Sequence, residues 1–169
     1  MSDFPSSILI MGVCGCGKSS VAAALAELLS YSFLEADNFH PPSNVCKMRS
    51  GTPLTDEDRA PWLAAIATAL RAARGAGRPC VLACSALKAR YREALRQGDP
   101  GLRVVHLHPP REAVAARLAA RMGHFMPPSL LDSQLAILEP PGGGEGAALT
   151  LDDAGGTPQA LARAVAAWL

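Results

Sequence analysis

The pattern G-x-x-x-x-G-K-[ST], typical of phosphate-binding loops, is met by Gly12-Val13-Cys14-Gly15-Cys16-Gly17-Lys18-Ser19. The apolar residues 8–11 before it predict a buried strand, and residues 21–29 after it carry leucines at the spacing of a helix. Glycines let successive backbone N–H groups approach phosphate oxygens, and a helix N-terminus adds a favourable field for an anion. We expect Lys18 to reach the β- and γ-phosphates of a nucleoside triphosphate and the Ser19 hydroxyl to ligate Mg²⁺. A glycine-rich turn without a ligand is the alternative, and the flanking strand and helix disfavour it.

Length, charge and cysteine usage are those of a single cytoplasmic domain, residues 1–169. The 16 basic and 15 acidic side chains nearly cancel, so no bulk charge favours nucleic acid or a membrane as partner. The first residues lack the basic region of a signal peptide, and no apolar run approaches the ~18 residues of a membrane span. The five cysteines contain no C-x-x-C pair, and an odd number fits no closed disulfide set.

Strand and helix patterns alternate along the chain. Further strands are predicted at residues 32–36, 80–84, 103–107 and 147–151. Helices are predicted at residues 44–49, with Ser43 as cap, and from a capping box of Thr55 and Asp58 to the glycines at 75 and 77. Further helices are predicted around Tyr91 and Leu95 and after Pro110. The last two are predicted from Ser129 to about Glu139 and at residues 158–169. The proline- and glycine-rich residues 140–146 predict a flexible linker. This alternation predicts an α/β fold with a parallel sheet covered by helices on both faces, whose ligands collect at the carboxyl ends of the strands.

Several polar residues fall at those strand ends. Asp37 closes the second predicted strand and is our candidate for a general base, with a capping or turn aspartate as the alternative. His40 has two equally weighted interpretations, a hydrogen bond to the acceptor or a contact within its own loop. Lys47, Arg49 and Arg59 suit a substrate carboxylate or phosphate, although charged side chains are mostly solvated.

A helix bearing Arg117 and Arg121 leads to His124 in a segment interrupted by glycine and proline. Such an arrangement resembles a lid that closes over phosphates, and an ordinary exposed helix is the alternative. The chain has no N-K-x-D string for reading guanine, and no later apolar strand ends in a clear aspartate. Metal binding is therefore expected to depend on Ser19, phosphates and water, with Asp37 acting only indirectly.

Taken together, these segments resemble the gluconokinases, small P-loop sugar-acid kinases, nearly end to end. The strings beyond the phosphate loop that carry the resemblance are D-x-x-H-P at residues 37–41, P-L-x-D-x-D-R at residues 53–59 and C-S-A-L-K at residues 84–88. The resemblance implies ATP- and Mg²⁺-dependent phosphorylation of D-gluconate to 6-phospho-D-gluconate. It also implies a three-layer P-loop kinase fold with a helical lid at about 117–138, and a cytoplasmic homodimer. Another small-metabolite or nucleotide kinase, or a non-catalytic ATP-binding regulator, is the alternative.

The resemblance also assigns roles to residues of this sequence. The catalytic set is Lys18, Asp37 as base, and Arg121. The ATP-binding set is Gly12, Val13, Cys14, Gly15, Cys16, Gly17, Lys18, Ser19, Ser20, Arg117 and Arg121, with Ser19 as metal ligand. The gluconate-binding set is Asp37, His40, Lys47, Arg59, Ser85, Lys88 and His124. Cys14 and Cys16 replace the serine or similarly small residue usual in the family, and sensitivity to thiol oxidation follows as a hypothesis beside simple tolerance.

Overall fold

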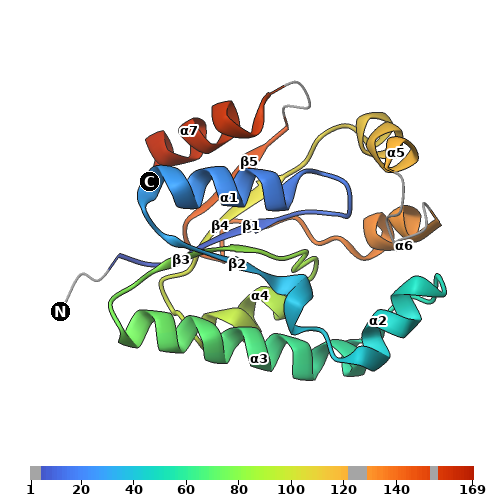
Figure 1. Cartoon of the computed structure of the whole chain (residues 1–169), viewed down its shortest axis with the longest axis horizontal. Helices are drawn as coiled ribbons and strands as arrows, with labels where there is room; N and C mark the ends of the chain where they lie inside the picture. Colours follow the sequence, from blue (N-terminus) through green and yellow to red (C-terminus); the bar gives the residue numbers. More distant parts are fainter. Residues whose placement is uncertain (1–4, 122–128, 153–155) are drawn as a thin grey trace.

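The computed structural model describes residues 5–121, 129–152 and 156–169, and these contain a five-stranded sheet between two layers of helices (Figure 1). All strand pairs are parallel, in the order β2-β3-β1-β4-β5. The strands are β1 (Ile8–Met11), β2 (Ser32–Glu35), β3 (Cys80–Ala83), β4 (Arg103–Leu107) and β5 (Ala148–Leu151). Each lies within its predicted range, so the three-layer α/β prediction is confirmed.

Helices α1 and α7 cover one face of the sheet, and α3 and α4 cover the other (Figure 1). The helices are α1 (Lys18–Leu29), α2 (Pro42–Arg49), α3 (Asp56–Gly75), α4 (Ala89–Arg96), α5 (Arg111–Ala120), α6 (Ser129–Ile137) and α7 (Pro158–Trp168), with a 3₁₀ helix η1 (Ala36–Phe39) after β2. Helices α2, α5 and α6 lie beyond the carboxyl ends of the strands (Figure 1). Within the described ranges no helix combines the length and the apolar character needed to cross a membrane.

The apolar strands supply two cores because strand side chains alternate between the faces of a sheet. Ile8 and Ile10 of β1 pack with α1 and α7, whereas Leu9 and Met11 pack with α3 and α4. A strand covered on both faces has no polar side, which is why the sequence of β1 reads as a continuous apolar run.

Helix α3 starts with the predicted capping box. The Thr55 hydroxyl accepts the Asp58 N–H at 3.1 Å, and the Asp58 carboxylate accepts the Thr55 N–H at 2.9 Å. Lys47 donates to the same carboxylate at 2.9 Å, and the hydrogen bonds from Lys47 and Thr55 lower the pKa of Asp58 to about 2. The predicted cap at Ser43 is wrong, since α2 already begins at Pro42. Proline suits the first helical position because its missing N–H needs no partner there.

The segment 140–146 is anchored rather than a plain flexible linker. The guanidinium of the fully buried Arg92 donates to the two carboxylate oxygens of Glu145 at 2.6 and 2.5 Å, and this lowers the pKa of Glu145. Arg92 Nη1 also donates to the carbonyls of Ala86 at 2.9 Å and Leu87 at 3.3 Å. A buried cation needs such partners. Arg92, itself held by Glu145, therefore fixes the loop after β3 through the carbonyls of Ala86 and Leu87.

His106 of β4 makes folding sensitive to acid. Its side chain is 1% exposed, and its Nδ1 has no hydrogen-bond partner among the described residues. Burial, assisted by the neighbouring His108 and Arg92, lowers the pKa of His106 to about 4. The unfolded chain binds this proton near pH 6.5, so between pH 6.5 and 4 the unfolded state holds more protons and stability falls as pH falls.

We predict that this histidine contributes a slope of up to ~1.4 kcal/mol per pH unit to the free energy of unfolding below pH 6.5. Urea unfolding of the wild type and of His106→Gln, measured from pH 7 to 4.5, separates this contribution from that of other groups. The variant should lose stability less steeply. Parallel curves for the two proteins would contradict the prediction.

Candidate active site

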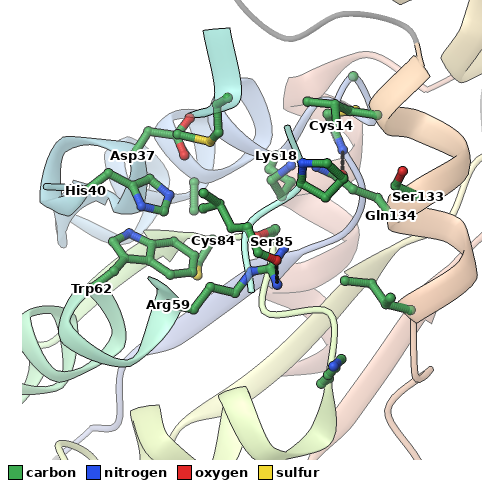
Figure 2. A pocket seen from close by; sticks show the side chains of 18 of the residues that line it. Cys14, Lys18, Asp37, His40, Arg59, Trp62, Cys84, Ser85, Ser133 and Gln134 are labelled. Carbon is green, nitrogen blue, oxygen red and sulfur yellow. Dashed lines mark hydrogen bonds between the residues drawn. The ribbon is translucent and has the colours of Figure 1, made fainter. Parts of the chain in front are cut away.

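A cavity of about 440 Å³ lies at the carboxyl ends of the strands (Figure 2). The phosphate loop, η1, the start of α3, the loop after β3 and α6 surround it. The predicted site residues that line it are Cys14, Gly15, Gly17, Lys18, Ser19, Ser20, Asp37, His40, Arg59, Ser85, Lys88 and Arg121. Residues far apart in the sequence therefore share one site.

The phosphate loop needs glycine at two tightly packed positions. Gly12 has φ of 149°, and a Cβ there would lie 2.6 Å from both Leu107 O and Cys16 Sγ. Gly15 has φ of 79°, and a Cβ there would lie 2.8 Å from Leu118 Cγ. These distances leave no room for a side chain, and both φ angles strain other residues. The loop is consequently wedged between β4 and α5.

Polar groups of the loop already have protein partners in this structure. Lys18 Nζ donates to the Val13 carbonyl at 3.0 Å, and the Cys14 N–H donates to Gln134 Oε1 at 2.7 Å. Figure 2 shows Gln134 of α6 reaching toward the loop at Cys14. Gln134 was not among the residues predicted from the sequence, because no local pattern connects a polar position in α6 with a loop 120 residues away.

Ser19 is paired with a carboxylate that sequence reasoning also missed. Its hydroxyl donates to Glu35 Oε2 at 2.5 Å, which leaves the oxygen lone pairs of Ser19 available. Oxygen ligands of this kind suit Mg²⁺. No group of three or more His, Cys, Asp or Glu side chains in the described ranges could hold a metal by itself. The sequence feature that could have indicated Glu35 is its place as an acid at the end of β2, two residues before Asp37.

The other side of the cavity carries Asp37 and several cations. Asp37 lies in η1, directly after β2, beside His40 (Figure 2). Arg59 Nη1 donates to the Leu54 carbonyl at 2.6 Å and to the Tyr91 hydroxyl at 3.1 Å. Both partners are neutral oxygens, which orient the guanidinium without neutralising it. Lys88 differs, since its Nζ lies 3.1 Å from the Asp56 carboxylate.

Six predicted residues are placed differently, and three of them, Gly12, Val13 and Cys16, are buried in the phosphate loop outside the cavity lining. Lys47 is not part of the cavity lining, because the Asp58 carboxylate holds its Nζ at 2.9 Å. Arg117 of α5 donates to the Cys16 carbonyl at 3.3 Å and so contacts the phosphate loop outside the lining. His124 lies outside the described residues, as does the rest of the predicted lid between Arg121 and Ser129.

The thiols of the phosphate loop are buried. Cys14 is 7% and Cys16 is 4% exposed. Burial raises the pKa of the Cys14 thiol, and the nearby Lys18 opposes this only in part. The neutral thiol is the unreactive form, so the structure disfavours the hypothesis of thiol oxidation at this loop. Simple tolerance of a small apolar side chain is the better interpretation.

Comparisons with known proteins show the family of this chain. A family model described as an AAA domain matches residues 8–141. A gluconokinase of Gluconobacter oxydans (strain 621H) is 52% identical over 141 residues, which cover 83% of this chain and 79% of that protein. The chain belongs to the gluconokinase family. The thermoresistant gluconokinase of Escherichia coli (strain K12) is 42% identical over 144 residues, with coverages of 85% and 82%.

Solved structures give the same family. A gluconokinase from Sinorhizobium meliloti 1021 is similar with a TM-score of 0.82 and 45% identity, covering 98% of this chain and 95% of that one. A shikimate kinase from Acinetobacter baumannii, at 20% identity and a TM-score of 0.58, shares the fold alone. Membership of the gluconokinase family confirms the resemblance drawn from the D-x-x-H-P, P-L-x-D-x-D-R and C-S-A-L-K strings.

We predict that one thiol of the folded protein reacts rapidly with 5,5′-dithiobis(2-nitrobenzoate). That thiol is Cys46, which is exposed, whereas Cys14, Cys16, Cys80 and Cys84 are buried. In denaturant all five should react. In a Cys46→Ser background, folded protein should be unreactive and should keep its ATP turnover after oxidant treatment. Rapid modification in that background, with loss of turnover, would restore the redox hypothesis.

Proposed function

We propose that this protein transfers the γ-phosphoryl group of ATP to the terminal hydroxyl of D-gluconate, forming 6-phospho-D-gluconate. The observation that carries the proposal is a single cavity with a phosphate loop on one side and a carboxylate and cations on the other. The names of the relatives at 42–52% identity support gluconate as the acceptor. A polyol that bears one carboxylate matches a receptor made of hydrogen-bonding groups and a guanidinium.

On the nucleotide side, backbone N–H groups of residues 12–20 would bind the phosphates of ATP. Lys18 would exchange the Val13 carbonyl for phosphate oxygens, and the Cys14 N–H would be freed by Gln134. Ser19 would hold Mg²⁺ together with phosphates and water, while the Glu35 carboxylate accepts a hydrogen bond from the Ser19 hydroxyl. Bound Mg²⁺ would neutralise charge on the β- and γ-phosphates. Arg117 and Arg121 would add positive charge from the lid.

On the acceptor side, Asp37 would take the proton of the terminal hydroxyl as its oxygen bonds to the γ-phosphorus and the bond to ADP breaks. Arg59 would bind the gluconate carboxylate through its guanidinium fork. His40, Ser85 and Lys88 line the same cavity and would orient the intervening hydroxyls. For Lys47 to contact gluconate, as predicted, its ion pair with Asp58 would have to rearrange. The predicted contact of His124 with gluconate would be made from the lid.

A cytoplasmic homodimer is the assembly that the family resemblance implies. Two large apolar side chains, Phe33 of the edge strand β2 at 40% and Leu28 of α1 at 51%, are exposed and would suit such a contact. Light scattering of the purified chain measures the state directly. The absence of nucleic-acid and membrane partners stays a prediction from charge and composition.

A coupled assay of ADP release with MgATP tests the proposal. The acceptor panel contains gluconate, related sugar acids, shikimate and nucleoside monophosphates. We expect turnover with gluconate and at most weak turnover with the others. Preference for shikimate or a nucleotide would be compatible with the P-loop kinase fold but would contradict gluconate as the acceptor. ATP binding without turnover on any acceptor would favour a non-catalytic regulator.

We predict that Asp37→Asn lowers kcat by about 10²–10⁴-fold, because a positioned general base contributes that much. Thermal stability and ATP binding should be retained, since Asp37 belongs to neither core cluster. Glu27→Gln on α1, an acid-to-amide change at an exposed residue outside the cavity lining, is the matched control. Near-normal kcat in Asp37→Asn would remove this carboxylate from the mechanism.

A further inference from the structure

Asn44 of α2 joins the catalytic cavity to helix α3 although it is itself buried, at 2% exposure. Its Nδ2 lies 2.9 Å from the Asp58 carbonyl oxygen and 3.2 Å from Nδ1 of His40. His40 lines the cavity, whereas Asn44 does not. Asn44 can therefore act on the site through His40, or by holding α2 against α3.

The Asp58 carbonyl fixes which way the Asn44 amide points. A backbone carbonyl accepts hydrogen bonds and cannot donate, so the amide atom that faces it must be the NH₂ nitrogen. With the opposite orientation two oxygens would meet in a buried place, which is costly. One hydrogen of the NH₂ group is then directed at Asp58, and the second is available for His40.

The second hydrogen decides where His40 carries its proton. An N–H of Asn44 directed at Nδ1 needs a lone pair there, and a neutral imidazole with a bare Nδ1 has its proton on Nε2. The ring cannot turn away easily. It stacks on Trp62 with centroids 4.1 Å apart and planes 11° apart, and Trp62 is itself held by a 2.7 Å hydrogen bond to the Ala36 carbonyl.

Burial keeps the His40 ring neutral. Burial lowers the pKa of His40, and the positive charge of Arg59 on α3 lowers it further. The negative charge of Asp37 in η1 raises the pKa, but the net result is a lowered pKa. Near pH 7.5 the ring therefore exists as one of two neutral tautomers rather than as a cation. A hydrogen bond from Asn44 to Nδ1 favours one of these two tautomers.

We propose that Asn44 is a positioning residue that holds His40 in the tautomer with its proton on Nε2. His40 then offers the acceptor a hydrogen-bond donor and cannot accept the proton of the attacking hydroxyl. That task is left to Asp37, the carboxylate beside it (Figure 2). The identity of the acceptor oxygen bound by His40 rests on the proposed function, but the tautomer does not.

Nitrogen-15 NMR of the full chain labelled at histidine tests the tautomer without any substrate. The four histidines are distinguished by comparison with His40→Gln. At pH 7.5 we expect Nδ1 of His40 to show the signature of an unprotonated nitrogen and Nε2 that of an N–H. A proton on Nδ1, or an averaged mixture of both forms, would overturn the proposal.

Asn44→Asp replaces the donor with an acceptor of the same shape and should move a proton to Nδ1. Asn44→Leu removes the donor and should give a mixture of tautomers. Gln159→Glu, the same amide-to-acid change at an exposed residue of α7, is the matched control and should leave the His40 signals unchanged.

In Asn44→Asp, kcat/KM for gluconate should fall by about tenfold or more, the effect of losing one good hydrogen bond, with KM for ATP little changed. A fall in kcat/KM while the proton stays on Nε2 would show that Asn44 acts by holding α2 against α3, and would overturn the proposal. The NMR result stands apart from the acceptor panel. An unexpected substrate preference would therefore overturn the proposed function and leave the tautomer test intact.

Discussion

The backbone of the phosphate loop imposes the constraint on which the other parts of the site depend. Gly12, Gly15 and Gly17 have φ angles of 149°, 79° and 94°, and the loop they form is pressed against Leu107 at the end of β4 and Leu118 of α5. This close packing holds the backbone of the loop in a phosphate-binding conformation, while the partners of the Cys14 N–H and of Lys18 would be exchanged for phosphate oxygens. Such preorganisation contributes most of the catalysis at a phosphoryl-transfer site, because the protein acts there by positioning groups and stabilising charge.

The parallel sheet then brings the acceptor groups to that loop. Because β3 lies between β1 and β2, the residues after β2 and β3 emerge beside the residues after β1. Glu35 and Asp37 reach the cavity from one strand end, and Ser85 from the next. The loop that carries Ser85 is in turn fixed by the buried Arg92. Packing in the core thus determines how the phosphate loop and the residues after β2 and β3 are placed relative to one another.

Local patterns were sufficient for the elements and for part of the site. The sheet, the capping box of α3 and the cavity positions of Lys18, Asp37 and Arg59 follow from hydrophobic period, motif and strand end. The pairings of Ser19 with Glu35, Cys14 with Gln134 and Arg92 with Glu145 did not, because each joins side chains whose proximity only the folded chain creates. Lys47 illustrates the same limit. Its place in the sequence suits a contact with a substrate anion, but in the folded chain it pairs with the Asp58 carboxylate.

The position of the phosphate on the product tests the arrangement most directly. In the proposed arrangement the gluconate carboxylate would bind Arg59, and the terminal hydroxyl would then be the one that reaches the γ-phosphate. Proton-coupled phosphorus-31 NMR of the product of MgATP and gluconate should therefore show phosphorus coupled to the two protons of a terminal methylene group. Coupling to the single proton of an internal carbon, or inorganic phosphate as the sole product, would contradict it.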